Sequence, residues 1–130
     1  MVQKFIIIWL SVILLASCKS SSPGVINKLT LMNDTIDLKS INQHDSVYVD
    51  FKLFNSNNFD TVRILNVAVS CGCTSIINGE QMILPNSIGI VRVKYKPNIN
   101  DSGSIIKSIG ISTNCSTPLQ FFYFKANISK

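Results

Sequence analysis

Two cysteines separated by a single glycine, Cys71 and Cys73, are the side chains in this sequence best suited to do chemistry. In an extended strand, residues two apart point to the same face with side chains roughly 6 to 7 Å apart, whereas a disulfide needs Cβ atoms about 3.8 Å apart. We therefore expect no bridge between these cysteines unless Gly72 bends the chain. If the strand register of residues 65–69 continues through them, both thiols face the core as small apolar groups.

Cys115 supplies a third thiol, in the turn formed by residues 114–118. The N-terminal residues, described below, indicate export into an oxidising compartment, where disulfides form and persist. A disulfide is therefore the second interpretation of these thiols, and the pairing expected for it joins Cys115 to either Cys71 or Cys73 and leaves one thiol free.

Two thiolates on one face also suit a soft metal ion such as Cu(I). His44 is the only histidine, however, and no methionine stands immediately beside the motif, so Cys71 and Cys73 are a weak metal-site prediction and no cofactor is expected. A redox site needs a thiol of lowered pKa beside a resolving thiol, and no helix N-terminus is predicted there to lower it. Core packing is the first interpretation of the motif, and metal binding and redox chemistry stay open behind it.

Motifs for catalysis are missing from the rest of the sequence. It contains no nucleophile elbow, phosphate-binding loop, pair of catalytic carboxylates or metal-ligand histidine pair. His44 stands in a polar stretch typical of an exposed loop. We therefore predict that the protein is not an enzyme.

Three basic residues, Arg92, Lys94 and Lys96, alternate along one segment and form a one-sided stripe. Such a stripe can meet an anionic surface or partner. The simpler interpretation is a solvated face whose charges prevent wrong strand pairing.

Three tripeptides resemble the Asp-Ser/Thr-aliphatic acceptor of O-glycosylation in some bacterial envelopes. Their candidate acceptors are Thr35, Ser46 and Thr61. Each tripeptide also stands where a turn gives way to a β-branched strand, so strand composition alone produces the same pattern.

The first seventeen residues have the pattern of a secretory signal peptide. Lys4 precedes an apolar run of about twelve residues, which is short of the about 20 that a membrane-spanning helix needs. The segment Leu15-Ala16-Ser17-Cys18 then resembles the lipobox of bacterial lipoproteins, in which the cysteine thiol takes diacylglycerol. We expect cleavage before Cys18 and a permanent anchor, because lipoproteins of this type carry two or three acyl chains, palmitate among them. The alternative is an ordinary cleaved signal that releases a soluble protein.

Lys19 follows the expected lipid cysteine, and no acidic run comes after it. The signals for inner-membrane retention and for surface export are therefore both missing, which favours the periplasmic face of an outer membrane. The expected location is the cell membrane or outer membrane, with the domain facing the periplasm. The net charge of the 130-residue chain is +5, and its cations are dispersed rather than clustered. Export and this dispersion argue against nucleic acid as a partner and leave a protein or glycan of the envelope.

Residues 18–27 are rich in Ser, Lys, Pro and Gly and are expected to be a flexible tether. Residues 28–130 show apolar alternation of period two, broken by Asn, Asp, Gly, Pro and Ser clusters. Strong strands are expected at residues 46–55, 61–69, 89–96, 103–113 and 119–128, and weaker ones at 26–32 and 35–38. Leu65, Val67 and Val69 are expected to face inward together. About seven short strands predict an all-β, antiparallel immunoglobulin-like β-sandwich, with a small closed barrel as the competitor.

The motif Ser70-Cys71-Gly72-Cys73-Thr74 and its surroundings carry a family resemblance. The strand ending Phe51-Lys52-Leu53-Phe54-Asn55, then Leu84-Pro85, Gly89, Tyr95 and Gly103 follow in the order of a family of bacterial lipoproteins of unknown function. The resemblance spans about residues 36–128. It implies an immunoglobulin-like domain at the cell envelope and no catalytic residue, and Cys115 is not part of the pattern.

The sequence thus predicts a lipid-anchored, non-catalytic binding or scaffolding module of the envelope. Such domains bind through loops or by strand addition at a sheet edge. The alternative is a thiol-dependent copper-binding or redox protein that uses Cys71 and Cys73.

Overall fold

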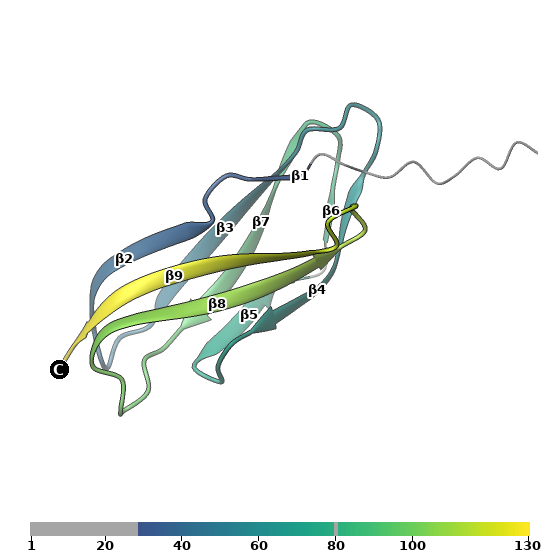
Figure 1. Cartoon of the computed structure of the whole chain (residues 1–130). Coiled ribbons are helices and arrows are strands. Elements are labelled where there is room, and N and C mark those ends of the chain that lie inside the picture. The colour runs from purple at the N-terminus through teal and green to yellow at the C-terminus, as the bar shows by residue number, and fades with distance from the viewer. Residues whose placement is uncertain (1–28, 80) are drawn as a thin grey trace, which may run out of the picture.

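The computed structural model describes residues 29–79 and 81–130. The expected signal peptide, the lipid cysteine Cys18 and the tether of residues 18–27 lie outside the described residues. The strands within them are β1 (Leu29–Leu31), β2 (Thr35–Asn42), β3 (Val47–Asn55), β4 (Val62–Val69), β5 (Thr74–Asn78), β6 (Gln81–Ile83), β7 (Ser87–Tyr95), β8 (Gly103–Thr113) and β9 (Leu119–Ser129). They form two sheets, of order β1-β3-β7-β5 and β2-β9-β8-β4-β6, which face each other as the layers of a sandwich (Figure 1). The predicted all-β sandwich is confirmed, with nine described strands in place of about seven.

One strand pair departs from the antiparallel expectation. β2 pairs with β9 in parallel, from Thr35 opposite Tyr123 to Asn42 opposite Ser129, and every other described pair is antiparallel. Because β3, the next strand after β2, belongs to the opposite sheet, β2 needs no hairpin partner and can align with β9 in either direction. A bulge interrupts the pair between Asp37 and Ser40.

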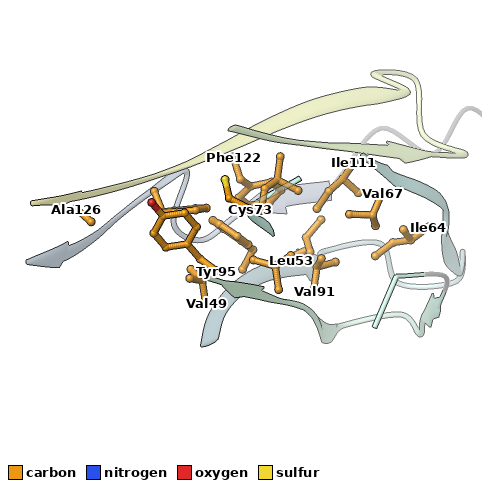
Figure 2. Close-up of a cluster of buried hydrophobic side chains, with 14 of the residues drawn as sticks. Val49, Leu53, Ile64, Val67, Cys73, Val91, Tyr95, Ile111, Phe122 and Ala126 are labelled. Carbon is orange, nitrogen blue, oxygen red and sulfur yellow. The ribbon is translucent and has the colours of Figure 1, made fainter. Parts of the chain in front are cut away.

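Alternating side chains of the two sheets fill the core. Phe51 of β3 and Phe122 of β9 lie with their ring centroids 5.0 Å apart, and Tyr95 of β7 and Phe124 of β9 repeat this spacing. Figure 2 shows Val49, Leu53 and Val91 of one sheet facing Ile111 and Phe122 of the other. Alternate residues of β3, β7 and β8 are buried in this core, and β9 lies inside its sheet, between β2 and β8.

Leu65 corrects the predicted face of β4. Its side chain is 48% exposed, although Ile64 and Val67 are buried. The pairing with β8 slips between Ile64 and Asn66, so Leu65 is the extra residue of a β-bulge and the alternation changes phase there. A period of two read through the bulge assigns Leu65 to the wrong face.

The loops gather at two opposite ends of the sandwich (Figure 1). We call one the disulfide end, made of residues 43–46, 70–73 and 96–102. The other is the Leu29 end, made of residues 56–61, 84–86 and 114–118, where Leu29 lies opposite Asn55. A partner or a membrane can therefore contact the domain at one of these two loop ends, on the outer face of a sheet or along a sheet edge.

Candidate functional site

The cysteine motif forms a corner between the two sheets. β4 ends at Val69, and the N–H of Ser70 donates to the carbonyl of Ser108 (3.1 Å) as the last bond to β8. β5 then begins at Thr74 in the other sheet, where the N–H of Lys96 donates to the carbonyl of Cys73 (2.9 Å). The four residues between the strands thus carry the chain from one layer to the next.

A disulfide joins Cys71 to Cys73, whose Cα atoms lie 5.2 Å apart. The corner is a turn in which the N–H of Thr74 donates to the carbonyl of Cys71 (3.2 Å). The expectation of two separate, core-facing thiols is therefore wrong, because the strand of β4 does not continue through them and the bend at Gly72 brings the sulfurs together. Cys73 is buried and Cys71 is half-buried.

Cys115 is a free, buried thiol, so the expected pairing with Cys71 or Cys73 is also wrong. It lies in the turn between β8 and β9, beside Asn114, whose N–H donates to the carbonyl of Arg63 near the start of β4 (3.2 Å). The disulfide follows the far end of the same strand, and its first cysteine, Cys71, is eight residues beyond Arg63, which is roughly 26 Å at about 3.3 Å per residue. Sequence alone did not place these cysteines at opposite ends.

The disulfide closes a loop of only three residues and cross-links no two strands of the core. In the chain-entropy account such a loop contributes about 1.6 kcal/mol, against about 4.7 kcal/mol for a loop of about 100 residues. Its contribution to fold stability is correspondingly small. The hydroxyl oxygen of Thr74 lies 3.5 Å from the sulfur of Cys71 and 3.9 Å from that of Cys73.

An open pocket of about 410 Å³ adjoins Cys73 on the disulfide end. Its lining comes from the corner, from the end of β7 and from the loop that follows: Gly72, Cys73, Ser75, Lys94, Lys96, Pro97, Asn98 and Ile99. Neither lysine forms an ion pair with any residue of the described ranges, and the ammonium of Lys94 lies 5.8 Å from the ring centroid of Tyr48. The pocket is therefore cationic on one side and bordered by a disulfide on the other.

Arg92 stands apart from the other two cations of the predicted basic stripe. Its guanidinium donates to both carboxylate oxygens of Asp50, at 2.6 and 2.7 Å. These hydrogen bonds from Arg92 hold the pKa of Asp50 below its usual range. Only Lys94 and Lys96 remain as unpaired positive charge on this stripe.

β5 is the least protected sheet edge of the described structure. No strand pairs with its outer side, it carries no charged residue, and Ile76 and Ile77 are 41% and 52% exposed. The edges β1 and β6 are three residues long, and the edge β2 carries a bulge and two charges, Asp37 and Lys39. Short length, bulges and charge are the features that block edge pairing, and β5 has only a bulge beside Ile77.

The loop of residues 97–101, which forms one wall of the pocket, is held in place from beneath. The buried side chain of Gln43 donates to the carbonyls of Asn98 (3.3 Å), Asp101 (3.3 Å) and Ile99. The carboxylate of Asp101 accepts from the N–H of Asn98 (2.9 Å) and from the hydroxyl of Tyr95 (3.2 Å). The pocket wall is thus preorganised by Gln43 and Asp101, which no motif in the sequence had identified.

The other candidate residues are not brought together. Thr35, Ser46 and Thr61 each stand at or just before the start of a strand, the first two exposed and Thr61 half-buried, and His44 is an exposed loop residue. Across residues 29–79 and 81–130, no three His, Cys, Asp or Glu side chains gather as a metal site. Within the same residues, no helix has the length and apolar character to cross a membrane.

Comparison with known proteins places this geometry in context. A family model described as a protein of unknown function (DUF1573) matches residues 29–128. No curated protein matches the sequence.

Solved structures share the fold. A protein of unknown function from Porphyromonas gingivalis W83 matches with a TM-score of 0.68 and 16% identity, over 83% of this chain and 50% of that one, so this chain spans half of its length. The PapD-like domain 7 of human CEP192 matches with a TM-score of 0.61 and 11% identity, over 88% and 93%. The YadV chaperone matches with a TM-score of 0.59 and 8% identity, over 78% of this chain and 52% of that one. Segments of a glycoside hydrolase and of a protease also match, at 22% and 32% of their lengths. At these identities the likeness shows an immunoglobulin-like or PapD-like sandwich and nothing further.

Proposed function

The chain belongs to the DUF1573 family of proteins of unknown function, and from that premise we propose that it is a lipid-anchored, non-catalytic binding module of the bacterial cell envelope. It recognises an extended segment of a protein partner by strand addition at β5. A glycan partner is the competing possibility that the experiment below separates.

The uncovered edge of β5 carries this proposal. In an antiparallel ladder, alternate residues direct their N–H and C=O groups away from the existing partner strand. The bond between Lys96 and Cys73 sets this phase and leaves the backbone of Ile76 facing outward. An added strand would satisfy these groups and cover part of the exposed surface of Ile76 and Ile77.

The setting of β5 favours partner binding over catalysis. It lies beside the cationic pocket, with Lys94 and Lys96 positioned to meet acidic groups of a partner. The YadV chaperone is among the proteins that share the fold, and the glycoside hydrolase and the protease match only over a minor part of their lengths. Lipid on Cys18 and a periplasmic address remain part of the proposal.

A photo-crosslinking amino acid at position 77, tested in intact cells, examines the proposal directly. We expect a discrete protein adduct from position 77 and none from position 106, where Ile106 is 68% exposed on the outer face of β8, away from any edge. Equal adducts from both positions, or adducts to glycan alone, would count against strand addition.

The disulfide favours a second function, thiol-disulfide exchange. An incoming thiolate attacks the sulfur of Cys71, forms a mixed disulfide with it and releases Cys73 as a thiolate beside Lys94 and Lys96. A second thiolate then releases Cys71, so two thiols are oxidised and one disulfide is reduced. Copper binding by the same pair requires this reduced state, because the disulfide leaves no thiolate to ligate a metal.

Replacing both cysteines with serine tests this second function. We expect the Cys71→Ser, Cys73→Ser variant to lose exchange with a glutathione redox buffer and to lose Cu(I) uptake after reduction. Unchanged redox and copper behaviour would remove the thiol-dependent function and leave the binding module.

A further inference from the structure

The Leu29 end presents large apolar side chains on two adjacent loops. Phe59, between β3 and β4, is 92% exposed, and Leu84, between β6 and β7, is 61% exposed. Single exposed apolar residues are normal on a soluble protein, so their exposure alone indicates nothing. Their shared position and its relation to the start of the domain are what distinguish them.

Asn55 holds the two loops together from inside. Its buried amide donates to the carbonyls of Asp60 (2.8 Å) and Leu84 (3.1 Å), and its oxygen accepts from the N–H of Asn57 (3.1 Å). The N–H of Asn86 also donates to the carbonyl of Asn57 (3.1 Å) across the loops. Phe59 and Leu84 are therefore carried on one fixed tip and project from it.

The described chain begins at the same tip. Leu29 pairs with Asn55, so the polypeptide from Cys18 enters the domain beside Phe59 and Leu84. Eleven residue steps separate Cys18 from Leu29, which span at most about 40 Å. A lipid on Cys18 would therefore be attached to the domain at this end and not at the disulfide end.

We propose that Phe59 and Leu84 dock the Leu29 end on the lipid bilayer, with both side chains in the interfacial region. The inference rests on the proposed lipidation of Cys18. Arg63, at the start of β4, is exposed and forms no ion pair with any described residue, so its guanidinium is available to a lipid phosphate. Asp60 lies beside Phe59 and opposes anionic lipid, so the contact depends on apolar insertion rather than on surface charge.

The anchor makes so small a contact effective. Two apolar side chains bind a bilayer weakly by themselves, but a short tether raises the local concentration of the tip at the surface into the millimolar range. The two ends lie at opposite ends of the sandwich (Figure 1), so docking directs the disulfide end, where the cationic pocket lies beside β5, away from the membrane. The tether then connects two contacts with the membrane, the lipid on Cys18 and the apolar side chains of Phe59 and Leu84.

A single tryptophan can report on the docked tip. Trp9 is the only tryptophan of the sequence and lies in the segment expected to be cleaved, so Phe59→Trp introduces one reporter into the mature chain. The matched control is Ile99→Trp, because Ile99 is 83% exposed at the disulfide end. Both variants are reconstituted as lipidated mature chains, which begin at Cys18 and lack Trp9, into phosphatidylethanolamine vesicles that contain brominated acyl chains.

We expect bromolipid to quench the fluorescence of the Phe59→Trp variant at least threefold more strongly than that of the Ile99→Trp variant, with a blue shift in the former alone. Vesicle flotation is measured on the same samples, so loss of the anchor and loss of docking are told apart. Failure to float overturns the inference together with its premise. Flotation with equal quenching of both variants overturns docking alone, and a blue shift of the Phe59→Trp variant without quenching identifies a second protein copy as the occupant instead.

Discussion

The buried side-chain amide of Asn55 donates a hydrogen bond of 2.9 Å to the backbone carbonyl of Ile83, 28 residues further along the chain. Asn55 ends a strand of one sheet, and Ile83 belongs to the edge strand of the other. One polar side chain thus fastens the two layers at the Leu29 end. Its removal leaves the buried carbonyl of Ile83 and the partly buried carbonyls of Asp60 and Leu84 without this donor.

Asn55→Ala is expected to destabilise the domain by about 2 to 4 kcal/mol, because each buried polar group left without a partner costs about 1 to 3 kcal/mol. Urea unfolding of residues 28–130 gives the free energy of unfolding. Asn100→Ala is the control, since Asn100 is exposed, and its unfolding free energy should change by less than about 0.5 kcal/mol. Equal effects of the two substitutions would contradict the role of Asn55.

Gly89→Ala is expected to destabilise the domain by about 1 to 3 kcal/mol through overpacking. A Cβ atom at Gly89 would overlap the Cγ1 and Cδ1 atoms of Ile83, whereas one at Gly110 would meet Phe121 at an ordinary 3.4 Å. Gly110→Ala should therefore stay close to the parent in the same unfolding experiment. Adding Ile83→Ala to Gly89→Ala should cost less than the two single changes together, because the overlap is already relieved.

The cysteine pairing predicts a definite thiol count. The domain of residues 28–130, prepared from an oxidising compartment and unfolded without reductant, should show one reactive thiol, that of Cys115, and three after reduction. Its intact mass should be two hydrogens below that of the reduced chain. The same spectrum tests glycosylation, because a hexose on Thr35, Ser46 or Thr61 adds its own mass. Three reactive thiols before reduction would contradict the disulfide.

Much of the fold follows from alternation in the sequence. The inward residues of β3 and β7, such as Phe51 and Val93, could be assigned because both strands pair along their whole length without a bulge. Leu65 could not, because one extra residue reverses the alternation and nothing in its own chemistry marks it. β5 and β6 were missed because five and three residues are too few to show a period.

The candidate site was predictable in its residues but not in its geometry. The Cys-Gly-Cys spacing drew attention to the corner, yet whether the sulfurs meet depends on where β4 leaves its sheet, and a long-range contact between Ser70 and Ser108 sets that point. Gln43 binds a loop about 55 residues further along the chain, and Asn55 binds two loops that lie 5 and 29 residues further along. The residues around each of them in the sequence do not indicate these long-range partners. Asn55 does carry a signal, because it is a polar residue in phase with the inward apolar residues of β3, whereas Gln43 stands in a polar stretch and carries none.

Tyr95 gives a test that depends on pH. Burial raises the pKa of Tyr95 to about 12, and the charge and hydrogen bond of Asp101 act in the same direction. An unfolded tyrosine has a pKa of about 10, so between about pH 10 and pH 12 the unfolded chain loses this proton first and stability falls as pH rises. Over that range the parent should lose about 2 to 3 kcal/mol more than Tyr95→Phe, measured by urea unfolding at each pH. Identical pH dependence in the two proteins would contradict the linkage.

Ile77→Lys tests whether β5 receives a partner strand. A charge on an edge strand disfavours pairing because it must be desolvated against the incoming chain. Ile77 is 52% exposed, so the substitution should change the unfolding free energy by less than about 0.5 kcal/mol. We expect it to lower the yield of partner crosslinked from position 76 at least tenfold, whereas Ile106→Lys leaves that yield unchanged. If both lysine variants keep the adduct, the partner does not add to β5. If both lose it, the adduct depends on surface charge in general and not on strand addition at this edge.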